Sequence, residues 1–544
     1  MQRWLQMVLD RPRWRAAAYV AGVAALYGPT YLIGRTPPLW VTGAVGSLLM
    51  LGAMALHQLS SLTAARAWLA RHSLSLVLVA GALVCVGSAL YTLFQYNRFV
   101  PWVDSPKFAR ALWLVLQGRG IQPVLGLDVP PQTHVTPTLL LVLPWYALMP
   151  SHLTLLLVRT VWLCAAAIPL FLVARRLVSG DIALLIALAY LGNFTILYHL
   201  TGEYYELQLF PTLFLLSCWW FERRAYGWWL CALWLIGGIR EEMGLVILCF
   251  ALLARLRGVP RSYWLGAMLI GVGWLFFSYE LILGLSRGDY AARYHYVFSQ
   301  HATGLSRLLN RENAQYLYHS GLPFALLLPW LGWSALPVLP VVLGSLLAGY
   351  PLAKVSFLAY GIPVATGCAY ATVQHLARLT ARLAAPQADR CAALLSLLVV
   401  TLSLSQTIEH VAYEKSLRPP LDGTLSAPVP LDSPIRRDPE SFRRWIAALR
   451  EAVRRIPDGH QAAAPAHVIA HLPHQPDPLD YGYERLDRLP EYVLVDDNVT
   501  DRDLLPRMPA VQRRLRESYQ VVYAKSGVVV YSRRGAPPKG IYSP

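Results

Sequence analysis

Charged residues are scarce in this chain. Asp, Glu, Lys and Arg make up 15% of its 544 residues, hydrophobic residues make up 56%, and the mean hydropathy is +0.41. A soluble protein of this size has too little polar surface to cover so much apolar material. The composition therefore excludes a soluble globular protein and predicts a polytopic membrane protein.

Several short motifs of enzyme chemistry are absent as well. The sequence has no Walker-type phosphate loop, no dinucleotide fingerprint and no zinc-protease motif. Its seven cysteines lie within or beside apolar segments, without zinc-type spacing, and none falls in the polar C-terminal region. Structural zinc and a disulfide framework are therefore not expected.

A nucleic-acid motif is also missing, although the net charge is +17. The arginines stand at the ends of apolar runs, where they indicate anchoring at the inner leaflet of a membrane. We therefore expect membrane lipid, and no nucleic acid, among the partners.

Acidic residues are rare before residue 410, and more than half of the 31 follow it. In the apolar part, basic clusters alternate with the few loops that carry carboxylates. Short cytoplasmic loops keep an excess of Lys and Arg, so the carboxylates are expected on the outer side. The basic clusters are Arg66/Arg71, Arg175/Arg176, Arg223/Arg224, Arg255/Arg257/Arg261 and Arg378/Arg382/Arg390, and the carboxylates are Asp104, Glu203, Glu206, Glu241 and Glu242.

Nine apolar stretches are long enough to cross a hydrocarbon core, which takes roughly 20 helical residues. They lie near 16–34, 39–57, 74–95, 153–174, 181–200, 205–221, 263–285, 355–376 and 391–409. The basic N-terminus lacks a convincing cleavage site and is interpreted as a cytoplasmic flank to a retained first span.

Two further apolar runs are interrupted. Residues 226–256 carry Arg240, Glu241 and Glu242 in the middle and basic residues at both ends. This favours a hairpin of two short helices with the charged triplet at its outer tip or in a protein-lined cavity. Prolines break residues 321–349, which again predicts two short helices. Counting both hairpins gives about thirteen spans, with the C-terminus outside.

Composition changes again after residue 410. A linker rich in Pro, Gly and Ser precedes SFRRWIAALREAVRRI, which has apolar residues at helical spacing. The runs AHVIAHL, YVLVD, VVYA and GVVVYS are typical of short strands. A small α/β domain on the outer side is therefore predicted.

The predicted fold is an all-α membrane protein with a large first outer loop and a small C-terminal α/β extracytoplasmic domain. The expected divisions are a cytoplasmic flank with three spans, an outer loop with an interfacial helix over 137–149, the remaining membrane core, a linker, and the outer domain with its tail. These divisions cover residues 1–95, 96–152, 153–410, 411–435 and 436–544.

Asp104 follows the third predicted span, with Lys107 and Arg110 close behind. A carboxylate here can accept a proton or bind a divalent metal, and the cations can hold phosphate oxygens. An interfacial acid paired with Lys107 or Arg110 is the simpler interpretation of Asp104.

His134 lies between prolines at the end of the same loop. It is a candidate for substrate binding or a wetted surface residue.

Glu203 and Glu206 lie beside His199 at a very short turn between two spans. Ionisable groups compressed between apolar helices cost free energy unless they are paired or functional. The same reasoning applies to the triplet in residues 226–256, since one charge at the bilayer centre costs about 2.5–3.5 kcal/mol. The alternative for that triplet is a salt-bridge lock between helices.

The order of these features resembles a bacterial membrane-protein family called domain of unknown function 2079, itself similar to GT-C glycosyltransferases that use polyprenyl-phosphate sugars. The family pattern FDLGIFDQALW is similar to VDSPKFARALW here, where Asp104 and the closing ALW match. Ala109 and Arg110 replace the second acid and the glutamine.

Later segments also resemble the family. His134 leading into LPWYALMP is similar to its histidine and proline-rich helix, and EYYELQLFP has Glu206 at the acidic place. Arg240-Glu241-Glu242 before Gly244 matches a Lys-Glu-Asp triplet in charge. The resemblance covers roughly residues 90–535.

The resemblance implies a GT-C architecture in which Asp104 is the catalytic base or a metal ligand. The preferred hypothesis is a glycosyltransferase of the bacterial inner membrane that moves a sugar from a polyprenyl-phosphate carrier to an unknown envelope acceptor at the outer face. Expected catalytic residues are Asp104, Glu206, Glu241 and Glu242, and expected substrate-binding residues are Lys107, Arg110, His134, Glu203, Arg240 and Lys354.

No cofactor is required by this hypothesis, but a divalent cation, Mg or Mn, is an option, with Asp104 as candidate ligand. Two rival functions stay open. A transporter or flippase of lipid-linked precursors would use the buried charges as a relay, and would show inverted repeats. A noncatalytic envelope scaffold would bind its partner through the outer domain.

Overall fold

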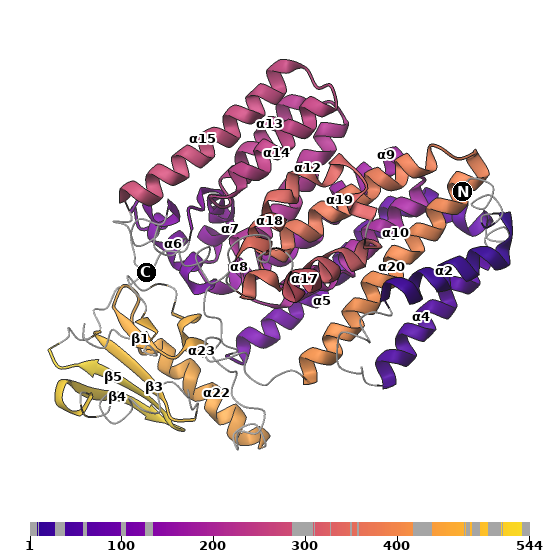
Figure 1. Ribbon diagram of the computed structural model, residues 1–544. Coiled ribbons are helices and arrows are strands. Elements are labelled where there is room, and N and C mark those ends of the chain that lie inside the picture. Colours follow the sequence, from indigo (N-terminus) through magenta and orange to yellow (C-terminus); the bar gives the residue numbers. More distant parts are fainter. Residues whose placement is uncertain are drawn as a thin grey trace.

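The structure is a computed structural model in which helices dominate (Figure 1). It describes residues 8, 10–27, 39–57, 63–99, 105–125, 134–285, 308, 310–326, 328–348, 351–355, 358–416, 438–472, 474, 479–480, 490–498, 513 and 515–535. Asp104 lies outside these described residues.

The helical part runs from α2 to α20. Its α-helices are α2 (Pro12–Tyr27), α4 (Leu39–His57), α5 (Thr63–Asn97), α6 (Ser105–Leu116), α7 (Leu143–Leu148), α8 (His152–Ala165), α9 (Ala167–Leu177), α10 (Gly180–Leu191), α11 (Phe194–Thr201), α12 (Phe210–Glu222), α13 (Tyr226–Gly237), α14 (Met243–Leu256), α15 (Arg261–Leu285), α17 (Arg311–Gly321), α18 (Leu339–Leu347), α19 (Gly361–Thr380) and α20 (Ala385–Ser416).

Short 3-10 helices connect several of these elements. They are η1 (Gln122–Leu125), η2 (Pro137–Val142), η3 (Glu206–Leu209), η5 (Leu322–Phe324), η6 (Leu328–Trp330), η7 (Trp333–Val338) and η8 (Pro351–Lys354).

Within the described residues, four helical segments are long and apolar enough to cross a membrane: Thr63–Asn97, His152–Leu177, Arg261–Glu280 and Ala385–Ile408. The pair α10 and α11 passes the same test together, bent by 50°. Asn193 starts α11 at the bend, because its side chain accepts a hydrogen bond from Thr195 N at 3.0 Å. The count of about thirteen spans stays a prediction.

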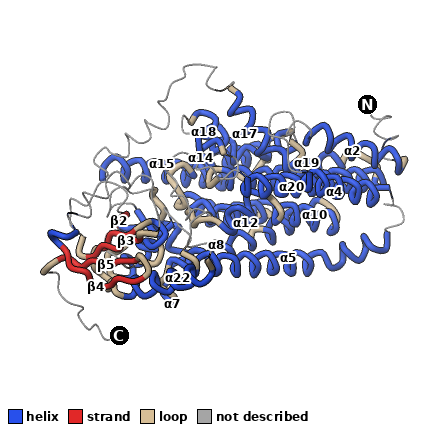
Figure 2. The backbone as a smooth tube through the Cα atoms, turned by 90° about the horizontal axis from the view of Figure 1, so that it is seen from below, coloured by secondary structure: helices blue, strands red, loops and turns tan. Residues whose placement is uncertain are grey.

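Some helices are buried in the bundle, and others expose large apolar side chains. α5 runs along one edge of the bundle (Figure 2) and exposes large apolar side chains such as Leu83, 69% accessible, and Leu90, 61%. α19 is buried along nearly its whole length. Exposed apolar surface on a helix of this length is expected of a lipid-facing span.

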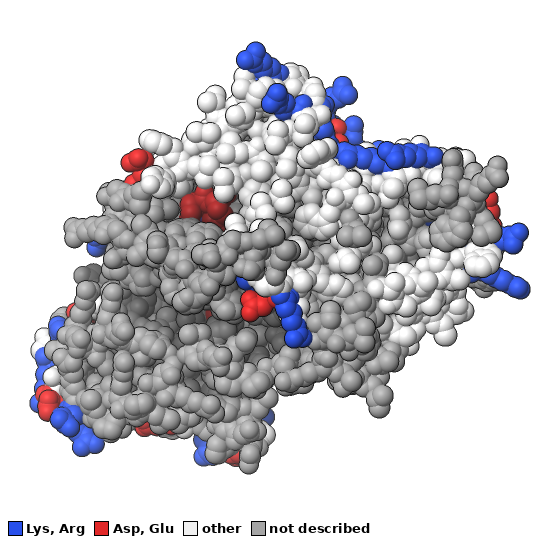
Figure 3. Space-filling model, in the orientation of Figure 1, with Lys and Arg blue, Asp and Glu red and all other residues white. Residues whose placement is uncertain are grey.

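Basic residues mark one end of the bundle. On the face shown in Figure 3, Lys and Arg side chains of the bundle gather mainly along its upper and right-hand edges, away from the strands at lower left. Arg66 at the start of α5 ties three helices together there. Its Nε donates to Asp181 Oδ2 on α10 at 2.7 Å, and its Nη2 donates to Asp389 Oδ1 on α20 at 2.7 Å.

The interrupted run over residues 226–256 forms the two predicted short helices, α13 and α14, with the charged triplet between them. The run over 321–349 differs from the prediction of two short helices. It holds η5, η6, η7 and α18, because Pro323, Pro329 and Pro337 each remove a backbone donor and keep the helical turns short.

The C-terminal α/β domain contains α22 (Pro439–Arg454), α23 (Ala466–Ile469) and a sheet of five strands. The strands are β1 (Ala462–Ala464), β2 (Leu479–Asp480), β3 (Tyr492–Asp496), β4 (Tyr519–Lys525) and β5 (Val528–Arg533), in the order β2-β1-β3-β5-β4. β1 pairs in parallel with β2 and β3, while β5 pairs antiparallel with β3 and β4.

One predicted strand of this domain is wrong. AHVIAHL begins with helix α23, and the strand β1 precedes it. Pro465 separates the two, since its ring fixes φ at −66° and favours the start of a helix just after it. The other three predicted strands correspond to β3, β4 and β5.

A candidate functional site around Arg240

The tip of the α13–α14 hairpin lies against the segment that follows His134. Thr138 N donates to Gly238 O at 2.9 Å, and Thr138 Oγ1 donates to Leu235 O at 2.6 Å. A Cβ at position 238 would lie 2.6 Å from Thr138 Oγ1, closer than side-chain carbons pack, so glycine permits this approach.

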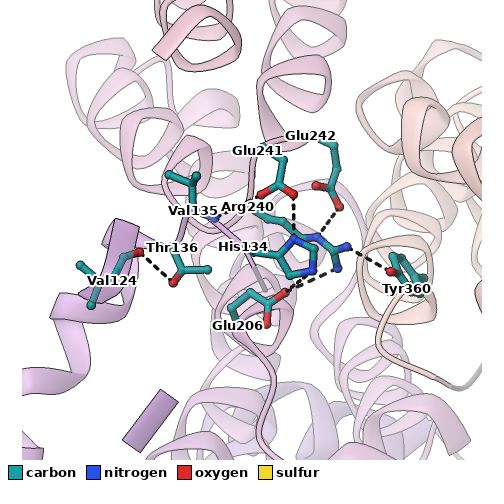
Figure 4. Close-up of polar contacts among 9 residues, drawn as sticks. All are labelled: Val124, His134, Val135, Thr136, Glu206, Arg240, Glu241, Glu242 and Tyr360. Carbon is teal, nitrogen blue, oxygen red and sulfur yellow. Dashed lines mark hydrogen bonds and ion pairs between the residues drawn. The ribbon is translucent and has the colours of Figure 1, made fainter. Parts of the chain in front are cut away.

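Arg240 at this tip contacts three partners from three segments (Figure 4). Its Nη1 lies 3.5 Å from Glu206 Oε1 on η3, and its Nε lies 2.9 Å from Glu242 Oε1. Its Nη2 donates to Tyr360 Oη at 3.0 Å. The planar guanidinium holds five N–H donors in a fixed arrangement, which suits it to several partners at once.

His134 joins the same group through Glu241. His134 Nδ1 lies 2.7 Å from Glu241 Oε1, and Val135 N donates to Glu241 Oε2 at 3.3 Å (Figure 4). The other ring nitrogen, Nε2, lies 4.0 Å from Glu206 Oε1. We call His134, Glu206, Arg240, Glu241, Glu242 and Tyr360 the ion cluster.

Further hydrogen bonds fix the segment after His134 on the opposite side. Thr136 N and Thr136 Oγ1 both donate to Val124 O on η1, at 2.8 and 3.2 Å. Thr136 and Thr138 therefore hold the segment between η1 and the hairpin. The position of His134 depends on both anchors.

The turn before Glu206 is held by Gln208 and Arg159. Gln208 Nε2 donates to Glu203 O at 2.7 Å, and Gln208 Oε1 accepts from Tyr205 N at 3.1 Å. Arg159 on α8 is fully buried and donates to Leu200 O at 2.8 Å and to Gly202 O. Cations favour the carbonyl end of a helix, here α11, so Arg159 steadies the turn that leads to Glu206.

Burial within the ion cluster is uneven. The side chains of Glu206, Arg240 and Glu241 are only 3%, 7% and 8% accessible, whereas those of His134 and Glu242 are 19% and 30% accessible. Buried carboxylates are costly unless paired, which explains why Arg240 and His134 lie between them. His134 and Glu242 are therefore the least buried of these five side chains.

The other predicted site residues lie elsewhere in the chain. Lys107 is exposed and Arg110 is buried, both on α6, and Glu203 is half-buried in the turn held by Gln208. Lys354 Nζ lies 3.4 Å from Glu312 Oε2. The cluster therefore unites five of the predicted residues from three distant segments.

Sequence reasoning missed four residues that shape this site: Tyr360, Thr138, Gln208 and Arg159. Tyr360 has no Asp, Glu, Lys or Arg within five residues on either side, so no charge marks its position. Arg159 is an arginine inside an apolar run, and this costly placement was the one signal that could have identified it.

Among the described residues, no group of three His, Cys, Asp or Glu side chains is arranged to hold a metal ion. The cluster's chemistry is that of acids and bases. A histidine oriented by a carboxylate can accept a proton through its second ring nitrogen, and further carboxylates can stabilise positive charge nearby.

Comparison with curated proteins finds none that matches this sequence. Among solved structures, the chain is similar to ArnT from Cupriavidus metallidurans bound to undecaprenyl phosphate, with 12% identity, a TM-score of 0.49, and coverage of 84% of this chain and 99% of that chain. The apo state of the same protein gives 13% identity, a TM-score of 0.46, and coverage of 84% and 98%.

A family model gives the decisive match. The family described as predicted membrane protein (DUF2079) matches residues 104–530, which is well over half of the chain and includes every residue of the ion cluster. The resemblance inferred from the sequence motifs is thereby confirmed, and the chain belongs to the DUF2079 family of predicted membrane proteins.

Proposed function

We propose that this protein is an integral membrane glycosyltransferase. It moves a sugar from a polyprenyl-phosphate carrier to an envelope acceptor at the outer face of the bacterial inner membrane. The observation that carries the proposal is the His134–Glu241 pair beside Arg240, partly accessible and built from segments that the sequence resemblance links to GT-C enzymes.

The charge of the ion cluster indicates which part of the substrates it binds. Three carboxylates face one guanidinium and one imidazole, so the cluster favours a positive species over a phosphate. Glycosyl transfer passes through an oxocarbenium-like sugar, which has this charge. We assign the sugar and the acceptor hydroxyl to the cluster.

In the proposed reaction, the acceptor oxygen bonds to the anomeric carbon while the bond from that carbon to the phosphate oxygen breaks. The acceptor hydroxyl gives its proton to a base, and the polyprenyl phosphate leaves with the bonding electron pair. His134, oriented by Glu241 and 19% accessible, is a candidate base in the described part of the chain, and Asp104 remains the base implied by the resemblance.

Cations outside the cluster are assigned to the donor phosphate. Lys107 is exposed on α6, and the Lys354 side chain is 11% accessible beside Glu312. Ammonium groups bind phosphate oxygens as point charges. A divalent cation, Mg or Mn, is an optional addition with Asp104 as its candidate ligand, and no step above requires it.

The test is transfer of radiolabelled sugar from polyprenyl-phosphate donors by the purified protein. Wild type is compared with Glu241→Gln, Asp104→Asn and the surface control Glu517→Gln, whose side chain is exposed on the C-terminal domain. We expect transfer by wild type and by the control, and a strong loss in Glu241→Gln.

Equal transfer by wild type and Asp104→Asn would remove Asp104 from the mechanism. No transfer by wild type with any donor would contradict the proposal and favour a transporter or a scaffold. The scaffold alternative further requires that Asp104→Asn is silent in cells while deletion of residues 436–535 is not.

A further inference from the structure

The C-terminal domain contacts the end of α5 through an aromatic residue. Phe99, two residues beyond α5, is 3% accessible and belongs to the same buried cluster as Trp445, Leu449 and Val468 of the domain. A residue of the membrane bundle thus completes the core of the C-terminal domain.

The backbone at Phe99 supports this interpretation. Its φ is +53°, in the left-handed region that large side chains rarely adopt. Such a conformation persists where surrounding contacts determine it. Here those contacts come from the domain core, so the chain leaves α5 in a direction set by the domain.

His471 of the domain completes the contact. Its ring lies 4.0 Å from the Phe99 ring and 4.2 Å from the Tyr96 ring, between centroids. Burial lowers the pKa of His471 well below its ordinary value, and His152, His467 and Arg450 act in the same direction. A neutral ring packs between the two aromatic side chains. Arg450 Nη2 adds a hydrogen bond to Asn97 O at 3.3 Å.

A second contact lies on α6. The Trp113 ring stacks on the His474 ring at 5.8 Å between centroids, with 18° between the ring planes. The domain therefore holds the chain on both sides of the connection from α5 to α6. Phe99 makes the contact before this connection, and Trp113 makes the contact after it.

Helix α6 lies between this interface and the ion cluster. Phe108 packs edge-on against Tyr204 at 5.5 Å, two residues before Glu206. α6 also packs against η1, whose Val124 O accepts both bonds from Thr136, two residues after His134. The segments that carry Glu206 and His134 are thus both supported by contacts with α6.

We propose that the C-terminal domain is a clamp that fixes α6 against the bundle through Phe99 and Trp113. Release of the clamp displaces α6 and, with it, the supports of His134 and Glu206. Phe99 and Trp113 are positioning residues, since neither belongs to the ion cluster.

The experiment measures the reactivity of a thiol at a buried position of α6. Ala109 is 0% accessible, and Ala109→Cys is introduced into the full-length protein with its seven native cysteines replaced. Labelling by a membrane-impermeant maleimide is compared among otherwise wild-type protein, Phe99→Ala, Phe99→Leu and the matched control Phe94→Ala. Phe94 is on the same α5 helix but is 54% accessible.

We expect Phe99→Ala to raise the labelling rate by about tenfold or more, because local opening exposes buried groups. Phe99→Leu, which refills the domain core, and Phe94→Ala should label like the otherwise wild-type protein. Unchanged labelling in Phe99→Ala, or equal labelling in Phe94→Ala, would overturn the proposal. If Phe99→Ala does not accumulate in membranes, Trp113→Ala replaces it in the same labelling experiment, with the same expected result.

Labelling needs no transferase activity. The experiment can therefore refute the clamp without refuting the proposed function, and the transfer assay can refute the function without refuting the clamp. Where wild type transfers sugar, Phe99→Ala should lower kcat with little change in KM for the donor. A change confined to KM would place Phe99 in donor binding and contradict a positioning role.

Discussion

His134 Nδ1 lies 2.7 Å from Glu241 Oε1, although the two residues are 107 positions apart in the sequence. If Glu241 accepts this bond, the imidazole proton is on Nδ1, and Nε2, which lies 4.0 Å from Glu206 Oε1, is the nitrogen that can accept a proton. This geometry makes Glu241 the orienting partner of His134 and distinguishes its role from that of the more exposed Glu242.

Glu241→Gln should lower the rate of sugar transfer by about 100-fold or more, in line with the usual contribution of an oriented acid or base. The amide preserves the shape but removes the charge that stabilises protonated His134. Initial rates with the polyprenyl-phosphate donor measure the effect. A rate within experimental error of the Glu517→Gln control would exclude His134–Glu241 from the chemistry.

Arg240→Met should destabilise the protein, because Glu206 and Glu242 lose their shared cation. Removing one partner of a buried ion pair costs about 3–5 kcal/mol. Thermal unfolding of the detergent-purified protein measures the loss. Adding Glu206→Gln to Arg240→Met should recover part of it, and a melting temperature equal to wild type in the single variant would show that Arg240 does not stabilise the cluster.

Gly238→Ala should reduce transfer because its Cβ would lie 2.6 Å from Thr138 Oγ1 and push the hairpin tip away from His134. Gly227→Ala, in helix α13, which ends just before Gly238, is the matched control, since a Cβ there meets nothing within 4 Å. Transfer assays on both variants, at equal amounts of folded protein, separate the two outcomes. Equal activity of the two would mean that the tip tolerates displacement.

Reporter fusions test the orientation of the bundle. Fusions at Gly120, after α6, should read as outside, and fusions at Ala225, between Arg224 and α13, should read as inside. Alkaline phosphatase activity and fluorescence of a cytoplasmic reporter give the readout. A cytoplasmic signal at Gly120 would mean that the ion cluster faces the cytoplasm, which contradicts transfer to an envelope acceptor.

The fold was predictable where the local sequence decides it. The apolar run over residues 39–57 is α4 with the same bounds, because a continuous apolar stretch without proline has one favourable structure in lipid. AHVIAHL was wrongly predicted as a strand, because a short apolar run with β-branched Val and Ile does not separate a short strand from a short helix after a proline.

Most residues of the candidate site were predicted from the sequence, but the contacts between them were not. Arg240, Glu241, Glu242 and Glu206 stood out because charges within apolar runs are costly. Their pairing did not follow from the sequence. Nothing in the run containing Tyr360 indicated that its hydroxyl would accept a hydrogen bond from Arg240 Nη2.

The sequence by itself determined that this is a helical membrane protein with its arginines collected at one end, since hydropathy and charge act over a few neighbouring residues. The tertiary structure alone decided that His134 pairs with Glu241 and that Phe99 enters the core of the C-terminal domain. Both contacts join segments more than 100 residues apart, and such contacts depend on how all the intervening helices pack.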